Sequence, residues 1–159
     1  MCNLFDTLYD DRQRERKAAM TTEHGAFWDD LAEDLQDPEF LRHYVVESMR
    51  IATIDRIVNE LDEARGAADL SKAALARAIS VEPAVVRRLF SAGHVNPTLG
   101  TLAEVAAALG MRITLEPLPE AERKAVTEPL LEGRAADPHG LAKHLSDLRR
   151  SKSRSSAAA

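Results

Sequence analysis

Two adjacent arginines, Arg87 and Arg88, are the residues best suited by type to bind another molecule. A guanidinium group can pair with a phosphate, or it can take both acceptors on the major-groove edge of a guanine. The apolar residues Val86 and Leu89 recur around the pair at helical spacing, which predicts that the arginines lie on a helix. The arginines alone do not exclude the alternative, a solvated helix face without a ligand.

Residue types that perform catalysis or bind metals do not occur in suitable patterns. The single cysteine, Cys2, excludes an internal disulfide and a cysteine-based zinc site. No serine lies in a nucleophile elbow, and there is no glycine-rich phosphate loop. We therefore expect no enzymatic activity, no metal and no cofactor. Five histidines lack the spacing of zinc ligands and are interpreted as surface residues: His24, His43, His94, His139 and His144.

Two short helices joined by a turn are predicted to position the arginines. Ser71 is an N-cap for the first helix, and Pro83 opens the second at the position where a missing N–H costs least. The turn is Ser80-Val81-Glu82, and Ala76 is small where the two helices must cross. Such a unit exposes its second helix, which fits a DNA major groove. The residues expected to face one core are Leu75, Ala76, Ile79, Val81, Val86 and Leu89.

Helices are also predicted on both sides of this unit. Phe27, Leu31 and Leu35 mark a short amphipathic helix with an acidic outer face. Asp37-Pro38 begins a long helix that runs to about Arg65 and either breaks near Ser48 or continues. Downstream, Thr98–Leu109 reads as a helix, with Gly110 as the residue after its C-cap.

The only predicted strand is Met111–Leu115, where apolar residues alternate with period two. A single strand cannot satisfy its own backbone groups, so it pairs with a copy of itself in a dimer or with an edge elsewhere. From Pro119 onward the chain contains three prolines and ends in a Ser-, Lys-, Arg- and Ala-rich stretch, with a short helix allowed at Gly140–Arg150. We expect that end to be largely flexible.

The charge is distributed unevenly along the 159 residues. Residues 1–66 carry 16 acidic and 8 basic residues, whereas residues 134–159 carry 2 acidic and 6 basic residues. The overall net charge of −5 therefore does not exclude DNA binding, because phosphate contact needs only local positive charge. The carboxylates Asp29, Asp30, Glu33 and Asp34 favour a solvated face or a surface for a basic partner over a metal site.

Four segments follow from this distribution. We predict a flexible segment at 1–25, an acidic helical extension at 26–66, a helix-turn-helix domain with a terminal strand at 67–117, and a basic, largely flexible tail at 118–159. No apolar run is long enough to span a bilayer, and the start lacks the order of a signal peptide, so a cytoplasmic protein is expected. Either Met1 or Met20 is the natural start.

The stretch Leu70-Ser71-Lys72-Ala73-Ala74-Leu75-Ala76 resembles the Leu-Thr-Gln-x-x-Leu-Ala pattern of the Xre/Cro family of helix-turn-helix repressors. The continuation Asn96–Leu102 and Ala108–Gly110, followed by a short strand, resembles the HigA-like antitoxins and related addiction-module antidote proteins. The resemblance covers about Asp37 to Pro117. It implies an all-α, lambda-repressor-like bundle with a helical extension before it.

The resemblance also implies roles for eight side chains on this bundle. Base edges would be read by Arg88 on guanine, Ala84 on a thymine methyl and Glu82 on a cytosine amino group. Phosphate contacts would come from Lys72, Arg77, Arg87, His94 and Asn96.

Three positions depart from the family pattern. Ser80 stands where the family usually has glycine, so it must adopt an unfavourable backbone angle or a modified turn. The family often pairs an arginine at the place of Arg65 with a glutamate, but here Phe90 takes the glutamate position, and the arginine could stack on that ring instead. The start of the second helix, Pro83-Ala84-Val85, is poor in base-reading groups.

The function that this resemblance implies is a dimeric transcriptional repressor of the antitoxin type. Its partners would be a palindromic double-stranded operator, a second copy of the chain and a cognate toxin, and no membrane. Two alternatives stay open: a stand-alone Xre-type regulator without a toxin, and a protein-interaction module that has lost DNA binding.

Overall fold

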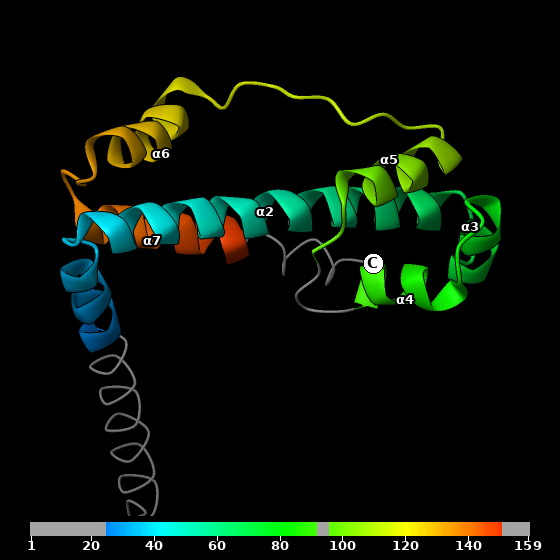
Figure 1. The fold of residues 1–159 in the computed structure, drawn as a ribbon, viewed down its shortest axis with the longest axis horizontal. Helices are drawn as coiled ribbons and strands as arrows, with labels where there is room; N and C mark the ends of the chain where they lie inside the picture. Colours follow the sequence, from blue (N-terminus) through cyan, green and yellow to red (C-terminus); the bar gives the residue numbers. More distant parts are fainter. Residues whose placement is uncertain (1–24, 92–95, 151–159) are drawn as a thin grey trace, which may run out of the picture.

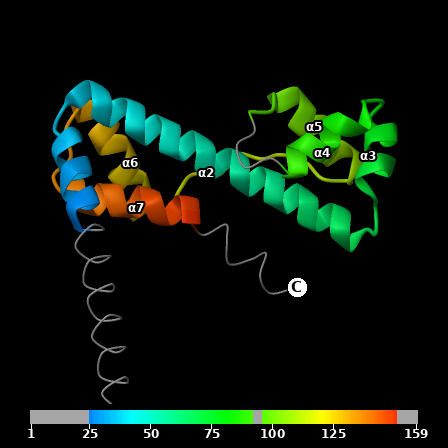
Figure 2. The same ribbon diagram turned by 90° about the horizontal axis from the view of Figure 1, so that it is seen from below.

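A computed structural model describes residues 25–91 and 96–150. In this part the chain forms a helix over residues 25–34, followed by α2 (Pro38–Ala67), α3 (Lys72–Ala78), α4 (Pro83–Ser91), α5 (Leu99–Ala108), α6 (Glu120–Glu132) and α7 (Pro138–Arg150). Helix α2 runs along the long axis. Helices α3 to α5 pack at one end of it, and α6, α7 and residues 25–34 lie at the other (Figures 1 and 2). The predicted all-α class is confirmed for these residues.

Local signals explain why α2 is long and continuous. The Asp37 carboxylate caps it by accepting a hydrogen bond of 2.7 Å from the Phe40 amide, and Pro38 occupies the first turn. Pairs at i,i+3 and i,i+4 follow along its surface: Glu47 with Arg50, Arg56 with Glu60, and Asp62 with Arg65. The hydrogen bond from Arg50 lowers the pKa of the Glu47 carboxyl. The helix passes through Ser48 without a break.

The two ends of α2 belong to two separate hydrophobic clusters. Val58 and Leu61, near its C-terminal end, pack with α3, α4 and α5; we call this the HTH cluster. Leu41 and Val45, near its N-terminal end, pack with residues from 25–34, α6 and α7; we call this the N-terminal cluster. The buried members of the HTH cluster are Val58, Leu61, Leu75, Ala76, Val86, Leu89, Leu102, Val105 and Ala106. Those of the N-terminal cluster are Leu31, Leu35, Leu41, Val45, Val126, Leu141, Ala142 and Leu145.

Helices α6 and α7 correct the expectation of a largely flexible tail over residues 118–159. Both pack on α2, because their apolar residues at helical spacing meet Leu41 and Val45 in the N-terminal cluster. The C-terminal end of α6 is held by Arg42, whose Nε donates to the Leu130 carbonyl at 3.1 Å. A short helix at 140–150 was allowed by the sequence and is present within α7. Residues 151–159 and residues 1–24 of the predicted flexible segment 1–25 lie outside the described residues, and residue 25 begins the helix over residues 25–34.

The predicted strand at Met111–Leu115 is not present in the described part of the chain. Residues 111–119 have no regular secondary structure and connect α5 to α6 (Figure 1). A strand requires a ladder partner, and for residues 112–118 the structure records no backbone–backbone hydrogen bond to another described residue. Ile113 packs against the HTH cluster, whereas Leu115 is 99% exposed.

Helix ends and turns around the HTH cluster follow the local rules. Gly110 follows Leu109, the C-cap of α5, and has a φ of +70°, as its predicted role requires. Ser80 has a φ of +56°, so the first of the two alternatives for this turn is confirmed: serine adopts the left-handed conformation that favours glycine.

Replacing Ser80 with glycine is expected to raise the free energy of unfolding by about 1 kcal/mol, because the left-handed conformation costs an L-residue about that much. The shift of the urea denaturation midpoint measures it. Ser146→Gly, inside α7, is the matched control and should lower the midpoint. A midpoint that does not rise for Ser80→Gly contradicts strain at the turn.

Candidate nucleic-acid interface

Helices α3 and α4 form a compact pair around small and apolar side chains. Ser71 caps α3, its Oγ accepting a hydrogen bond of 3.1 Å from the Ala74 amide. Leu75 and Ala76 are fully buried where the helices cross, and the Val81 amide donates to the Ala76 carbonyl at 3.0 Å across the turn. Val86 and Leu89 bury the inner side of α4. The predicted cap, crossing point and core are confirmed.

One exposed stripe remains on α4. Ala84, Arg87, Arg88 and Ser91 lie at i, i+3, i+4 and i+7, and all four are exposed. Glu82, just before the helix, is exposed as well. The stripe thus brings together two of the three residues predicted to contact bases, Ala84 and Arg88, with Arg87 from the phosphate-contacting set, and Glu82 lies outside it. Two guanidinium groups on one exposed face can bind acceptor atoms of DNA.

The other residues predicted to contact phosphate are spread around this pair of helices. Lys72 and Arg77 lie at opposite ends of α3, about 8 Å apart along its axis. Asn96 is exposed just before Thr98, the residue that caps α5. His94 lies outside the described residues.

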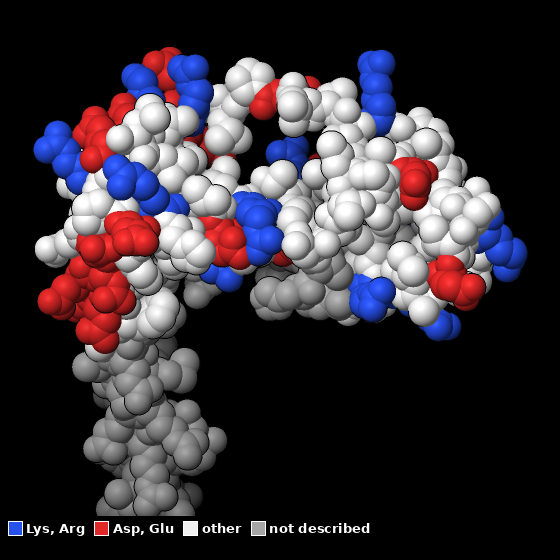
Figure 3. Space-filling model, viewed as in Figure 1, with Lys and Arg blue, Asp and Glu red and all other residues white. Residues whose placement is uncertain are grey.

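Charge is distributed differently at the two ends of the molecule. In the face shown by Figure 3, acidic side chains gather at the end that carries residues 25–34, and fewer charged side chains cover α3 to α5. The exposed carboxylates at the acidic end include Asp29, Asp30, Glu33 and Asp34. Asp29 Oδ1 accepts a hydrogen bond of 2.8 Å from His139 Nε2. Among the described residues, no group of three or more His, Cys, Asp or Glu side chains is placed to hold a metal ion.

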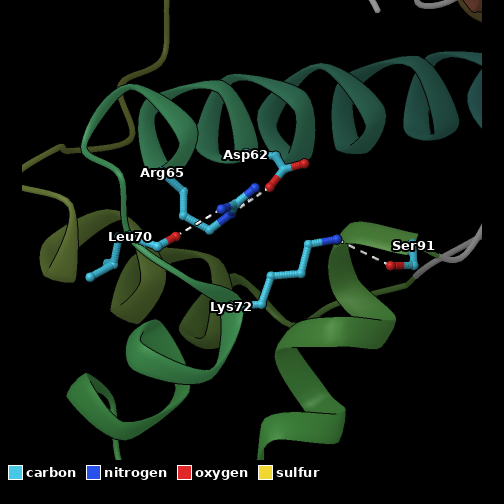
Figure 4. Close-up of polar contacts among 5 residues, drawn as sticks. All are labelled: Asp62, Arg65, Leu70, Lys72 and Ser91. Atoms are coloured by element: carbon cyan, nitrogen blue, oxygen red, sulfur yellow. Dashed lines mark hydrogen bonds and ion pairs between the residues drawn. The ribbon is translucent and has the colours of Figure 1, made fainter.

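A set of contacts at the C-terminal end of α4 joins three helices (Figure 4). The Arg65 guanidinium donates to Asp62 Oδ1 and to the Leu70 carbonyl, both at 2.7 Å. It also lies 5.9 Å from the centre of the Phe90 ring, as the stacking interpretation expected.

Sequence reasoning missed two contacts of Lys72 at this point. Its ammonium donates to Ser91 Oγ at 3.2 Å and lies 5.8 Å from the Phe90 ring centre. Ser91 was not a candidate residue, although its i+7 spacing from Ala84 would have placed it on the exposed stripe.

Comparison with known proteins identifies the region that contains this site. Residues 61–115 match the helix-turn-helix family, from the last turns of α2 through the extended segment after α5. No curated protein and no solved structure matches the chain. The Xre/Cro-type helix-turn-helix prediction is confirmed for these residues and supports a DNA-binding transcription regulator. The HigA-like subgroup stays a prediction.

Proposed function

We propose that the chain is a cytoplasmic, non-enzymatic repressor that binds a palindromic operator as a homodimer and neutralises a cognate toxin. The observation that carries the DNA-binding part is the exposed stripe of Ala84, Arg87, Arg88 and Ser91 above a fully packed core. Because the inner side of α4 packs against this core, the helix can enter a major groove without rearrangement.

Direct base reading by this stripe is limited. Arg88 binds a guanine through two hydrogen bonds, Ala84 meets a thymine methyl, and Glu82 accepts from a cytosine amino group. Lys72, Arg77, Arg87 and Asn96 bind phosphates, which fix the position of the protein on the duplex. Because few groups read bases, DNA shape and the spacing of two half-sites supply much of the specificity.

Support for a homodimer comes from the extended segment Met111–Leu115. Its outward side chain, Leu115, is almost fully exposed, and its backbone groups have no ladder partner among the described residues. A second copy that packs on Leu115 would bury it, and a dimer on a palindromic operator would need its two α4 helices about 34–36 Å apart. Light scattering on the complex with DNA measures the number of chains per duplex. A molar mass that corresponds to one chain per duplex would contradict the homodimer.

Support for a toxin partner comes from the acidic end opposite the helix-turn-helix. The carboxylates of residues 25–34 are exposed and complement a basic protein surface. The expected partner is the basic product of a short neighbouring gene, and co-purification of the two chains at low salt tests it. If no gene for such a partner lies beside the gene of this chain, the protein is the stand-alone regulator instead.

The double variant Lys72→Ala/Arg88→Ala is expected to weaken binding to the DNA upstream of the protein's own gene by about 100-fold in a mobility-shift assay. The reason is the loss of one bidentate base contact, about 1–3 kcal/mol, together with one phosphate contact. The matched control is Lys124→Ala/Arg134→Ala, which removes the same charge from exposed sites at the other end.

Two results separate the proposed function from its rivals. A wild-type protein that shifts no DNA at modest salt, with or without its partner, is not a repressor. If neither the wild type nor the double variant binds DNA and both keep their partner, the chain is a protein-interaction module, for which the apolar start of α4 at Ala84 and Val85 would be the contact surface.

A further inference from the structure

The side chain of Phe90 lies where two cations from different helices meet. The ring is half-buried and packs against the HTH cluster. The Arg65 guanidinium, from the end of α2, and the Lys72 ammonium, from the start of α3, lie 5.9 Å and 5.8 Å from its centre. Both distances are within the range in which a ring face attracts a cation.

The two cations differ in what else holds them. Arg65 is fixed by Asp62 and by the Leu70 carbonyl, and its side chain is only 19% exposed. Lys72 donates to the Ser91 hydroxyl. An ammonium has three donors, so Lys72 can keep this bond and still donate to a phosphate.

An aromatic ring at this position has a different electrostatic effect from a carboxylate. A ring attracts a cation through its quadrupole and carries no net charge, so the charge of Lys72 is not cancelled. A carboxylate on α4 would attract the same ammonium and neutralise it. Arg65 does not need such a carboxylate, because Asp62 already pairs with it.

We infer that Phe90 is a positioning residue for DNA binding, which holds the Lys72 ammonium beside Ser91 and leaves its full charge for a backbone phosphate. The inference rests on the proposed DNA-binding function and names how one phosphate contact of that interface is prepared. It gives Phe90, which is half-buried and lies outside the exposed stripe, a measurable effect on the salt dependence of binding.

The test measures binding of the full chain to a random-sequence DNA duplex by fluorescence anisotropy across a salt series. For Phe90→Glu, the slope of log affinity against log salt should fall in magnitude by about 1, and the affinity at low salt by about tenfold, as for one lost phosphate contact. Phe90→Tyr keeps the ring and should keep both values. Leu131→Glu adds the same charge at an 82% exposed site in α6 and should also keep both.

Two further variants separate positioning from folding. Phe90→Leu retains apolar bulk without the ring and should lose about two- to fivefold in affinity, with recovery in Phe90→Tyr. In a Lys72→Gln background, Phe90→Glu should change the slope no further.

Three outcomes overturn the inference. The first is a salt slope that is unchanged in Phe90→Glu. The second is a fall of the slope by Phe90→Glu in the Lys72→Gln background that equals its fall in the wild-type background. Equal affinities of Phe90→Leu and the wild type would overturn it even if Phe90→Glu unfolds. In all three outcomes the wild type still binds the duplex, so the proposed DNA-binding function stands. A wild type that does not bind the duplex at the lowest salt contradicts both the inference and the proposed function.

Discussion

Leu75→Ala is expected to lower the free energy of unfolding by about 2–5 kcal/mol, the usual loss when a buried leucine leaves a cavity. Leu75, on α3, is fully buried in the HTH cluster, which also contains residues of α2, α4 and α5. Small domains are stable by about 5–15 kcal/mol in total, so this loss should raise the unfolded fraction of the variant. The variant should therefore bind DNA weakly or not at all under conditions close to its unfolding transition. Urea denaturation followed by circular dichroism measures the loss.

The control for this prediction is Leu99→Ala in α5. Leu99 is 69% exposed, and its truncation should change the unfolding free energy by no more than about 0.5 kcal/mol. Equal effects of the two variants would show that the packing around Leu75 does not determine stability.

Leu145→Ala is the matching change in the other half of the molecule. Leu145 is fully buried where α7 packs on α2, so a loss of about 2–5 kcal/mol is again expected. The loss should be local: amide hydrogen exchange should accelerate in α6 and α7 before it does in α3 to α5. DNA affinity should persist under conditions in which α3 to α5 stay protected.

The exposed residue Leu131, in α6, provides the control, and Leu131→Ala should leave exchange unchanged. If Leu145→Ala removes DNA binding as completely as Leu75→Ala, then the two clusters act as one cooperative unit and the expected separation is wrong.

Local chemistry explains which parts of the fold could be predicted from the sequence. Asp37, Ser71 and Gly110 act within a few residues of themselves, so their effects on helix ends are readable without a structure. The same is true of Ser80, whose strain follows from its place in a known turn.

Helices α6 and α7 could not be predicted with the same success. In α6 the apolar residues are few and are interrupted by charges and Pro129, whereas α7 has Leu141, Leu145 and Leu148 at helical spacing, for which the sequence allowed a short helix. Val126 and Leu145 become buried because α2 presents Leu41 and Val45 to them. That is tertiary information. The contact between Lys72 and Ser91 likewise joins residues 19 positions apart and depends on how α3 and α4 cross.

The continuity of α2 fixes the rotational phase of one half of the molecule against the other. From Leu41 to Leu61 the helix advances about 30 Å, and each added residue would turn its far end by about 100°. One residue inserted between Val45 and Val58 would therefore rotate the acidic end about the axis of α2 relative to α4. An insertion of about seven residues would nearly restore the original orientation of the two ends. If selection acts on the direction in which a partner meets the DNA-bound protein, relatives should differ here by lengths close to whole numbers of turns, such as about seven or about eleven residues.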